Sequence, residues 1–353
     1  MSGLLQQEFC INRAERLRPH ILRVEVSLVK LWANRKEVCM RVIITGGTGF
    51  IGRTLAAALQ ATGYEVVVLS RNPARATGLP AGVRCERWDA RSAAGWGSLA
   101  NGALAIINLA GENLAGAGFL PGRWTAERKH LIRQSRLDAG KAVLEAVEQA
   151  AVKPQVVIQA SGIGHYGDRG DAVLTEADSA GRGFLADLTV EWEGSTAGVS
   201  AWGVRHVVIR SGVVLSPTEG ALYRLLLPYK LFLGGPMGGG RQWLAWIHPA
   251  DEVAAIRFLM ERQEAVGAFN LCAPNPVTYA EFGRVLGRVL GRPSWLPVPA
   301  WALRLALGEV ASTVLESQRA LPRRLLDLGF QFRFPTAEAA LRDLLRQPPA
   351  ARR

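Results

Sequence analysis

The 353-residue sequence has few cysteines and no long apolar run. Its four cysteines, at positions 10, 39, 85 and 272, form no Cys-x-x-Cys pair, so the chain lacks the pattern of a disulfide framework or a zinc site. No stretch approaches the ~18 consecutive apolar residues of a membrane-spanning helix, and no compact apolar segment resembles a secretory signal. We therefore expect a cytoplasmic protein with reduced thiols, no metal and no membrane partner.

Basic residues outnumber acidic ones without forming a patch. The sequence carries 42 Lys and Arg against 30 Asp and Glu, a net charge of +12, and half of this excess lies in residues 1–40 and 341–353. The remaining basic residues are scattered, whereas a nucleic-acid-binding surface normally shows a clustered patch or stripe. We expect no nucleic-acid partner.

The composition is that of a folded protein, with 49% hydrophobic and 20% charged residues. The length allows two domains or one large α/β unit with an appended lobe. We expect residues 1–39 to be an extension that is disordered or foreign to the native protein, and dispensable for folding. Residues 40–298 are predicted to form a nucleotide-binding domain with substrate-lobe insertions, residues 299–346 a helical C-terminal segment, and residues 347–353 a tail.

Strand and helix patterns alternate from Met40 onward. Apolar runs at 41–45 and 64–69 flank a helical pattern at 53–62, which predicts a β-α-β unit. The alternation continues with predicted strands at 103–109, 155–160, 205–211 and 268–271 and predicted helices at 126–150, 184–197, 249–262 and 278–290. This order is typical of an α/β fold, a Rossmann-type doubly wound parallel sheet with a smaller C-terminal lobe.

A glycine-rich turn, TGGTGFIG at 45–52, joins the first predicted strand to the first helix. Gly46 permits the tight turn, Gly49 lets the backbone approach a pyrophosphate, and Gly52 lets the helix contact the strand. The amides that open the helix provide donors for phosphate oxygens. The turn therefore predicts a dinucleotide site at Gly46, Thr48, Gly49, Phe50, Ile51 and Gly52.

The end of the second predicted strand indicates which dinucleotide binds. An NAD site usually places Asp or Glu there to bind the ribose 2′-hydroxyl. This chain has Ser70 and Arg71 instead, and a guanidinium beside a hydroxyl suits a 2′-phosphate. We predict NADP as the cofactor, the alternative being that Arg71 is only a solvated residue at a strand end.

Several motifs together resemble a known family. The turn GGTGFIG, the SRNP segment at 70–73 and the NLAGEN segment at 108–113 are similar to the extended short-chain dehydrogenase/reductase superfamily. Segments at 124–138, 161–167, 207–216 and 234–255 resemble its atypical sugar-epimerase-like branch, the YfcH-like proteins. The resemblance covers about residues 40–346.

This resemblance implies an NADP-binding sheet with a smaller C-terminal lobe over the cofactor. It implies that the adenosine side of the dinucleotide path is lined by Leu109, Ala110 and Gly111, with Glu112 at the mouth. It also implies that Arg136 and Arg210 lie near the cofactor. Two alternatives remain, an exposed helix position for Arg136 and a paired position in the core for Arg210.

The sequence departs from the superfamily at the proton relay. A typical member carries Tyr-x-x-x-Lys on the helix after the Ser-bearing strand, where the Lys lowers the pKa of the Tyr. Those positions fall here on Leu185 and Thr189, which cannot exchange a proton in this way. We expect Ser161 or Tyr166 to supply the catalytic proton, with His165 as a further candidate. The alternative is that this loop is a plain turn beside the cofactor.

Two further segments have candidate roles. The Gly-rich loop at 234–240 and the following Trp243 predict a substrate loop, in which the indole could stack on a base or a sugar. His248 and Asp251 resemble a catalytic pair. We interpret Asp251 instead as the N-cap of the helix that follows Pro249, and His248 as a packing residue.

These features predict an NADP-dependent oxidoreductase or epimerase-like enzyme that acts at a carbonyl or hydroxyl carbon of a small molecule, with a sugar nucleotide as one candidate. The missing Tyr–Lys pair leaves a second class open. The second class is that of NADP(H)-responsive binding or regulatory proteins without turnover. The sequence predicts neither the identity of the substrate nor an oligomeric state.

Overall fold

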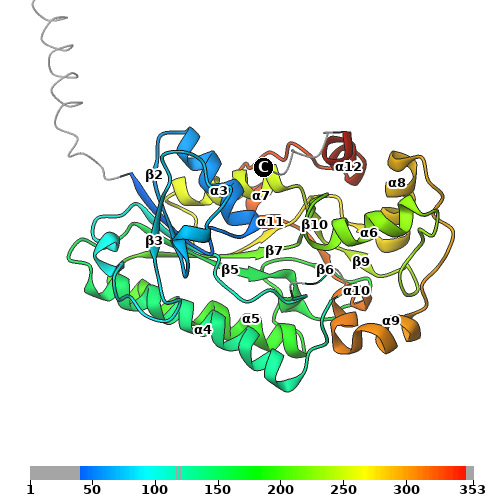
Figure 1. The fold of residues 1–353 in the computed structure, drawn as a ribbon, viewed down its shortest axis with the longest axis horizontal. Coiled ribbons are helices and arrows are strands. Elements are labelled where there is room, and N and C mark those ends of the chain that lie inside the picture. Colours follow the sequence, from blue (N-terminus) through cyan, green and yellow to red (C-terminus); the bar gives the residue numbers. More distant parts are fainter. Residues whose placement is uncertain (1–39, 117, 119–120, 347–353) are drawn as a thin grey trace, which may run out of the picture. The chain divides into compact units, whose positions relative to one another are not determined.

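Seven strands form a parallel central sheet (Figure 1). The structure is a computed structural model, and it describes residues 40–346 except 117, 119 and 120. The expectations for residues 1–39 and 347–353 concern residues outside this described part. The strand order is β11-β7-β5-β4-β1-β2-β3, with bounds β1 Arg41–Thr45, β2 Glu65–Ser70, β3 Arg84–Arg87, β4 Ala105–Asn108, β5 Val156–Gly162, β7 Arg205–Ser211 and β11 Gly267–Leu271. The predicted Rossmann-type α/β fold is confirmed.

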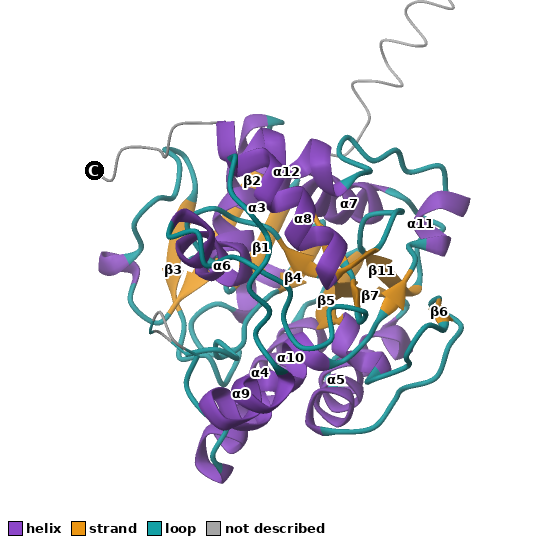
Figure 2. Ribbon diagram, turned by 90° about the vertical axis from the view of Figure 1, so that its right-hand side faces the viewer, coloured by secondary structure: helices purple, strands orange, loops and turns teal. Residues whose placement is uncertain are grey.

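Helices cover both faces of this sheet (Figures 1 and 2). Helices α3 (Phe50–Ala61) and α7 (Pro249–Glu261) lie on one face, and α4 (Ala126–Gln149) and α5 (Phe184–Gly194) on the other. Because successive residues of a strand point to opposite faces, each strand contributes to two cores. Double burial explains why these strands are continuous apolar runs in the sequence.

The strand order reverses at β1. From β1 the chain passes through α3 to β2, and after β3 it returns to the other side of β1 as β4. In open parallel sheets, a crevice forms beyond the carboxyl ends of the strands at such a reversal. The glycine-rich turn lies at this point, since it connects β1 to α3. Helix α3 begins at Phe50, earlier than predicted, because Gly49 is its N-cap.

Most of the remaining elements form the predicted smaller lobe, whereas helix α11 (Arg323–Asp327) packs against β11 of the central sheet. Apolar side chains of α6, α8 and α12 share a core with Trp246 and Phe334. Figure 2 shows α6, α8, α9 and α10 at the end of the molecule that faces the viewer. The helix bounds are α6 Gly220–Lys230, α8 Tyr279–Leu290, α9 Ala300–Leu307, α10 Ser312–Leu315, α11 Arg323–Asp327 and α12 Ala337–Arg346. The short strands are β6 Val173–Leu174, β8 Val213–Val214, β9 Trp243–Leu244, β10 Trp246–Ile247, β12 Val277–Thr278 and β13 Arg319–Ala320.

The predicted cap of α7 is wrong. His248 caps the helix, because its Nδ1 accepts a hydrogen bond from the amide of Ala250 at 3.1 Å. The Asp251 carboxylate instead accepts the amides of Arg333 and Phe334, at 2.8 and 2.9 Å, and so fastens the C-terminal segment to α7. The packing role of His248 is confirmed, since its ring lies 3.8 Å from that of Phe334 between centroids.

None of the helices in the described range is long and apolar enough to span a lipid bilayer.

Candidate functional site

The glycine-rich turn leaves no room for side chains. Gly46 has a φ of +66°, and a Cβ there would lie 2.7 Å from the carbonyl carbon of Leu109. A Cβ on Gly52 would lie 2.5 Å from the carbonyl oxygen of Gly46. No side chain caps α3, and the first amides of a helix have no acceptor within the helix. The turn is therefore a tight cradle with amide donors left available for an anion.

A cavity of about 420 Å³ opens beside this cradle. It is lined by the turn and by the ends of β2 and β4, and among its lining residues are Gly46, Thr48, Gly49, Ser70, Arg71, Arg75, Leu109, Ala110, Gly111 and Glu112. Most residues predicted for the adenosine half of the site are thus brought together. Neither Phe50 nor Gly52 is on this wall, and Ile51 faces the next cavity.

The cavity wall contains one cation that the sequence analysis missed. Arg75 lies four residues beyond Arg71 and lines the same cavity. Both side chains are exposed, and neither guanidinium has a hydrogen-bond partner among the described residues. The short 3-10 turn Pro73–Arg75 brings Arg75 back to the strand end, and the Pro at its start is the signal that could have revealed it.

A second cavity of about 320 Å³, here called the inner cavity, opens at the carboxyl ends of β5 and β7. Its wall includes Ser161, Leu185, Thr189 and Ser211. Ile51 lines it from the first turn of α3, whose N-cap lines the cradle cavity. The two cavities are therefore neighbours on either side of one helix N-terminus.

Ser161 is held by a charged pair beneath the inner cavity. Its hydroxyl donates to Oε1 of Glu193 at 2.6 Å, and Arg210 donates to both carboxylate oxygens at 2.9 Å. Burial opposes ionisation of Glu193, but the hydrogen bonds from Arg210 and Ser161 outweigh it and keep the pKa below its usual value. Glu193 is therefore a carboxylate. Arg210 adopts the paired core position that the sequence left as its alternative and does not line either cavity.

Tyr166 belongs to the support of this pair and not to the cavity wall. The side chain is fully buried, and its hydroxyl donates to Oδ1 of Asn270 at 2.8 Å and accepts from Arg210 at 3.1 Å. Burial raises its pKa. Of the two expected proton donors, only Ser161 faces the inner cavity. His165 is likewise buried, and its Nδ1 lies 3.5 Å from Oε1 of Glu193.

Arg136 lies between the two cavities. It is buried, which excludes the exposed helix position, and its guanidinium lies 4.6 Å from the ring of Trp192. It donates to the carbonyl oxygens of Ile132 and Glu112, at 2.9 and 3.0 Å. Burial lowers its pKa to about 10, so it remains a cation at neutral pH. It lines the inner cavity, while the neighbouring Ser135 lines the cradle cavity.

Helix α5 carries both the positions predicted for the proton relay and a carboxylate that the sequence analysis missed. Leu185 and Thr189 line the inner cavity, where the superfamily pair would lie, but neither can relay a proton. Glu193 follows Thr189 by four residues, so it lies on the same helix face. This spacing is the signal that could have revealed Glu193 from the sequence.

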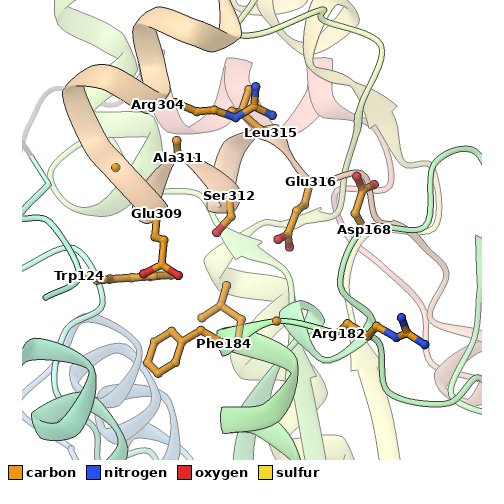
Figure 3. A pocket seen from close by; sticks show the side chains of 13 residues that line it. Trp124, Asp168, Arg182, Phe184, Arg304, Glu309, Ala311, Ser312, Leu315 and Glu316 are labelled. Carbon is orange, nitrogen blue, oxygen red and sulfur yellow. The ribbon is translucent and has the colours of Figure 1, made fainter. Parts of the chain in front are cut away.

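A third cavity, of about 530 Å³ and here called the outer cavity, is shown in Figure 3. Trp124 and Phe184 line one side of it, and the C-terminal residues Glu309, Ser312 and Glu316 line the other. Leu185 and Glu316 line both cavities, so the inner and outer spaces meet between them. The sequence analysis missed this contribution of the C-terminal segment.

The predicted substrate loop contributes few residues to the walls of these cavities. Trp243 lines the inner cavity, but its indole donates to Oδ1 of Asp171 at 2.9 Å and the guanidinium of Arg319 lies 4.3 Å from its ring. One ring face is therefore already occupied. None of the glycines at 234–240 lines the cradle, inner or outer cavity.

The doubly wound sheet, the glycine-rich cradle and the C-terminal lobe define an epimerase-like Rossmann protein. A family model described as NAD dependent epimerase/dehydratase family matches residues 42–272, and one described as a domain of unknown function (DUF1731) matches residues 298–344. The chain belongs to the NAD dependent epimerase/dehydratase family, which confirms the family resemblance seen in the sequence.

Relatives match along most of the chain. The epimerase family protein YfhF of Bacillus subtilis (strain 168) is 39% identical over 308 residues, which cover 87% of this chain and 98% of YfhF. The human epimerase family protein SDR39U1 is 35% identical over 308 residues, covering 87% of this chain and all of that protein. A crystal structure of human SDR39U1 (isoform2) with NADPH has a TM-score of 0.77 at 33% identity, and the match covers 86% of this chain and 98% of that chain.

Proposed function

We propose that this protein binds NADP(H) across the cradle and inner cavities and acts as an oxidoreductase or epimerase-like enzyme at a carbonyl or hydroxyl carbon of a small molecule. The observation that carries the proposal is the arrangement of the two cavities around one helix N-terminus. One cavity has Arg71 and Arg75 on its wall, and the other has Ser161 paired with a carboxylate. The relative that was crystallised with NADPH supports this choice of cofactor.

The cradle residues fit the pyrophosphate and the 2′-phosphate of NADP. The uncapped first turn of α3 offers amides to the pyrophosphate, and the close backbone packing at Gly46 and Gly52 lets a ligand approach the chain. Ser70 offers a hydroxyl to a 2′-phosphate, and Arg71 and Arg75 offer two guanidinium groups that have no hydrogen-bond partner in the described part of the chain. When bound, NADP(H) supplies hydride exchange with the substrate carbon.

Ser161 is the residue that this proposal assigns to proton exchange: in carbonyl reduction its hydroxyl gives its proton to the substrate oxygen and regains one from water. The Glu193 carboxylate fixes the orientation of the hydroxyl, and Arg210 keeps that carboxylate charged. Tyr166 acts only through Arg210 and is a positioning residue. Reaction at the cavity therefore depends on a buried charged pair in place of a Tyr–Lys relay.

Cofactor selection is tested by Arg71→Asp, with NADPH and NADH binding measured by fluorescence. A charged hydrogen-bonded contact contributes on the order of 1.5 to 3 kcal/mol, so NADPH should bind at least about tenfold more weakly and the gap to NADH should narrow. Arg284→Glu, a similar charge change at an exposed position of α8, should leave both affinities unchanged. Equal losses for NADPH and NADH in Arg71→Asp would contradict the assignment.

The chemistry is tested by single-turnover NADPH oxidation with a carbonyl substrate found in a broad panel. Loss of a general acid costs ~100-fold or more, so Ser161→Ala should lose that much. Tyr166→Phe keeps the buried ring and should lose less. An unchanged rate in Ser161→Ala would remove the serine from the reaction.

The second candidate function is an NADP(H)-responsive binding protein without turnover. Leu185 and Thr189 at the relay positions, together with the burial of Tyr166, favour it. Tight NADPH binding with no oxidation by any carbonyl in the panel, and a protein partner whose affinity depends on the cofactor's oxidation state, would support this function over the first.

A further inference from the structure

The inner cavity has a second serine–glutamate pair that the proposed reaction does not use. Ser211, at the end of β7, lines the cavity and donates to Oε1 of Glu252 at 2.6 Å. Glu252 lies in the first turn of α7 and is 1% exposed. Its second oxygen, Oε2, has no hydrogen-bond partner among the described residues.

No cation among the described residues pairs with Glu252. Burial raises its pKa to about 8, and only the hydrogen bond from Ser211 acts in the opposite direction. From the sheet side, the thiol of Cys272 interacts electrostatically with Glu252, and its own pKa is raised mainly by burial and further by Glu176 and Glu252. On α7 itself, Asp251 is engaged by the backbone of the C-terminal segment. Helix α3, which packs against α7, contributes the apolar side chains of Leu55 and Leu59 to the same core.

The carboxyl group of Glu252 lies near the cavity that would hold the nicotinamide end of the cofactor. Under the proposed function the cradle cavity, with Arg71, holds the adenosine end, so the nicotinamide end extends past the first turn of α3 into the inner cavity. Glu252 does not itself line that cavity, but its hydrogen-bond partner Ser211 does. A charge on Glu252 would therefore act across a buried region, where charges are screened much less than in water.

We propose that Glu252 is an ionisable counter-charge for the nicotinamide end, which makes the preference for NADP+ over NADPH depend on pH. This inference rests on the proposed function. The nicotinamide ring is positively charged in NADP+ and neutral in NADPH. Ionised Glu252 therefore stabilises bound NADP+, while NADPH gains nothing from it. By linkage, NADP+ binding favours release of the proton from Glu252.

The test is the ratio of the Kd of NADP+ to the Kd of NADPH, measured from pH 6.5 to 9.5. NADPH is titrated by its fluorescence, and NADP+ by displacement of NADPH. The phosphates are the same in both nucleotides, so their titration cancels in the ratio. A pKa lowered by one unit corresponds to about a tenfold gain in affinity, and we expect the ratio to fall by about three- to tenfold across this range.

Two variants locate the effect. Glu252→Gln should give a ratio that does not change with pH. Ser211→Ala should move the midpoint of the change to higher pH, because it removes the hydrogen bond that lowers the pKa of Glu252. If Glu252→Gln folds poorly, the shift of the midpoint in Ser211→Ala still tests the role of Glu252. Glu316→Gln, which removes the carboxyl group that itself lines the inner cavity, should keep the wild-type slope.

The outcomes separate this inference from the proposed function. A ratio that is flat in the wild type, or a slope that survives in Glu252→Gln, would overturn the inference while cofactor binding stands. The inference would also be overturned if the pH dependence of the Kd ratio disappeared in Glu316→Gln and not in Glu252→Gln. If the chain bound neither nucleotide, the proposed function and the inference would both fall.

Discussion

Two serine–glutamate pairs face the same cavity and differ in charge. Ser161 donates to Glu193, and Ser211 donates to Glu252, each at 2.6 Å. The pKa of Glu193 lies below its usual value, whereas that of Glu252 is raised to about 8. Burial acts in the same direction on both, so the hydrogen bond from the serine does not decide the charge. The difference comes from Arg210, which forms an ion pair with Glu193 and not with Glu252.

The strand β7 distributes these partners between the two pairs. Arg210 and Ser211 are consecutive residues, and consecutive side chains of a strand point to opposite faces of the sheet. Arg210 therefore reaches Glu193 on α5, and Ser211 reaches Glu252 on α7, from the helix layers on the two faces. The end of one strand therefore provides a cation for the carboxylate of Glu193 on one face of the sheet and only a hydroxyl for the carboxyl group of Glu252 on the other.

The largest expected effect comes from making the first pair resemble the second. Arg210→Met removes the cation and leaves Glu193 buried without compensation, so the free energy of unfolding should fall by about 3 to 5 kcal/mol in urea denaturation at pH 7. The double variant Arg210→Met with Glu193→Gln should recover most of this loss, because no buried charge then remains. Equal losses in the single and double variants would show that Arg210 stabilises the fold by packing and by its bond to Tyr166.

The next effect concerns the second pair alone. Because the pKa of Glu252 is raised in the folded state to about 8 from 4.5, the folded protein binds more protons than the unfolded chain between these values. The contribution of Glu252 to stability is complete below pH 4.5 and is lost as the pH rises through 8. Glu252→Gln lacks this loss, so its stability relative to wild type should rise by about 4 kcal/mol between pH 5 and 9. Urea denaturation across this range measures the difference, and a constant difference would contradict the charge state assigned to Glu252.

The cradle was predictable from the sequence, and the two pairs were not, for one physical reason. The cradle is local: Gly46, Gly49 and Gly52 lie within one strand–turn–helix unit, and the backbone geometry of that unit requires them. Ser161 was also found, because it ends a predicted strand. The spacing along α5 could place Glu193 on the cavity side of its helix, but the contacts of Glu193 with Ser161 and of Glu252 with Ser211 span 32 and 41 residues, so no local pattern shows these partners.

The same distinction explains why Tyr166 lies off the cavity wall and why Asp251 does not cap α7. Both were assigned from their neighbours in the chain, Tyr166 from a loop after a strand and Asp251 from a helix start. Their actual partners are distant, Asn270 for Tyr166 and the backbone of Arg333 and Phe334 for Asp251. Chain position identified the polar residues but not the side of the sheet or the segment with which each would bond.

The smallest expected effect compares the two serines directly. A hydrogen bond to a charged group contributes about 1.5 to 3 kcal/mol, and one between neutral groups about 0.5 to 1.5 kcal/mol. At pH 7 Ser161→Ala should therefore destabilise the protein more than Ser211→Ala in urea denaturation. At pH 9 Glu252 is ionised as well, so the loss in Ser211→Ala should grow and the gap between the two variants should narrow. A gap that is the same at both pH values would mean that the two carboxyl groups share one charge state, and the contrast between the pairs would then lie in packing alone.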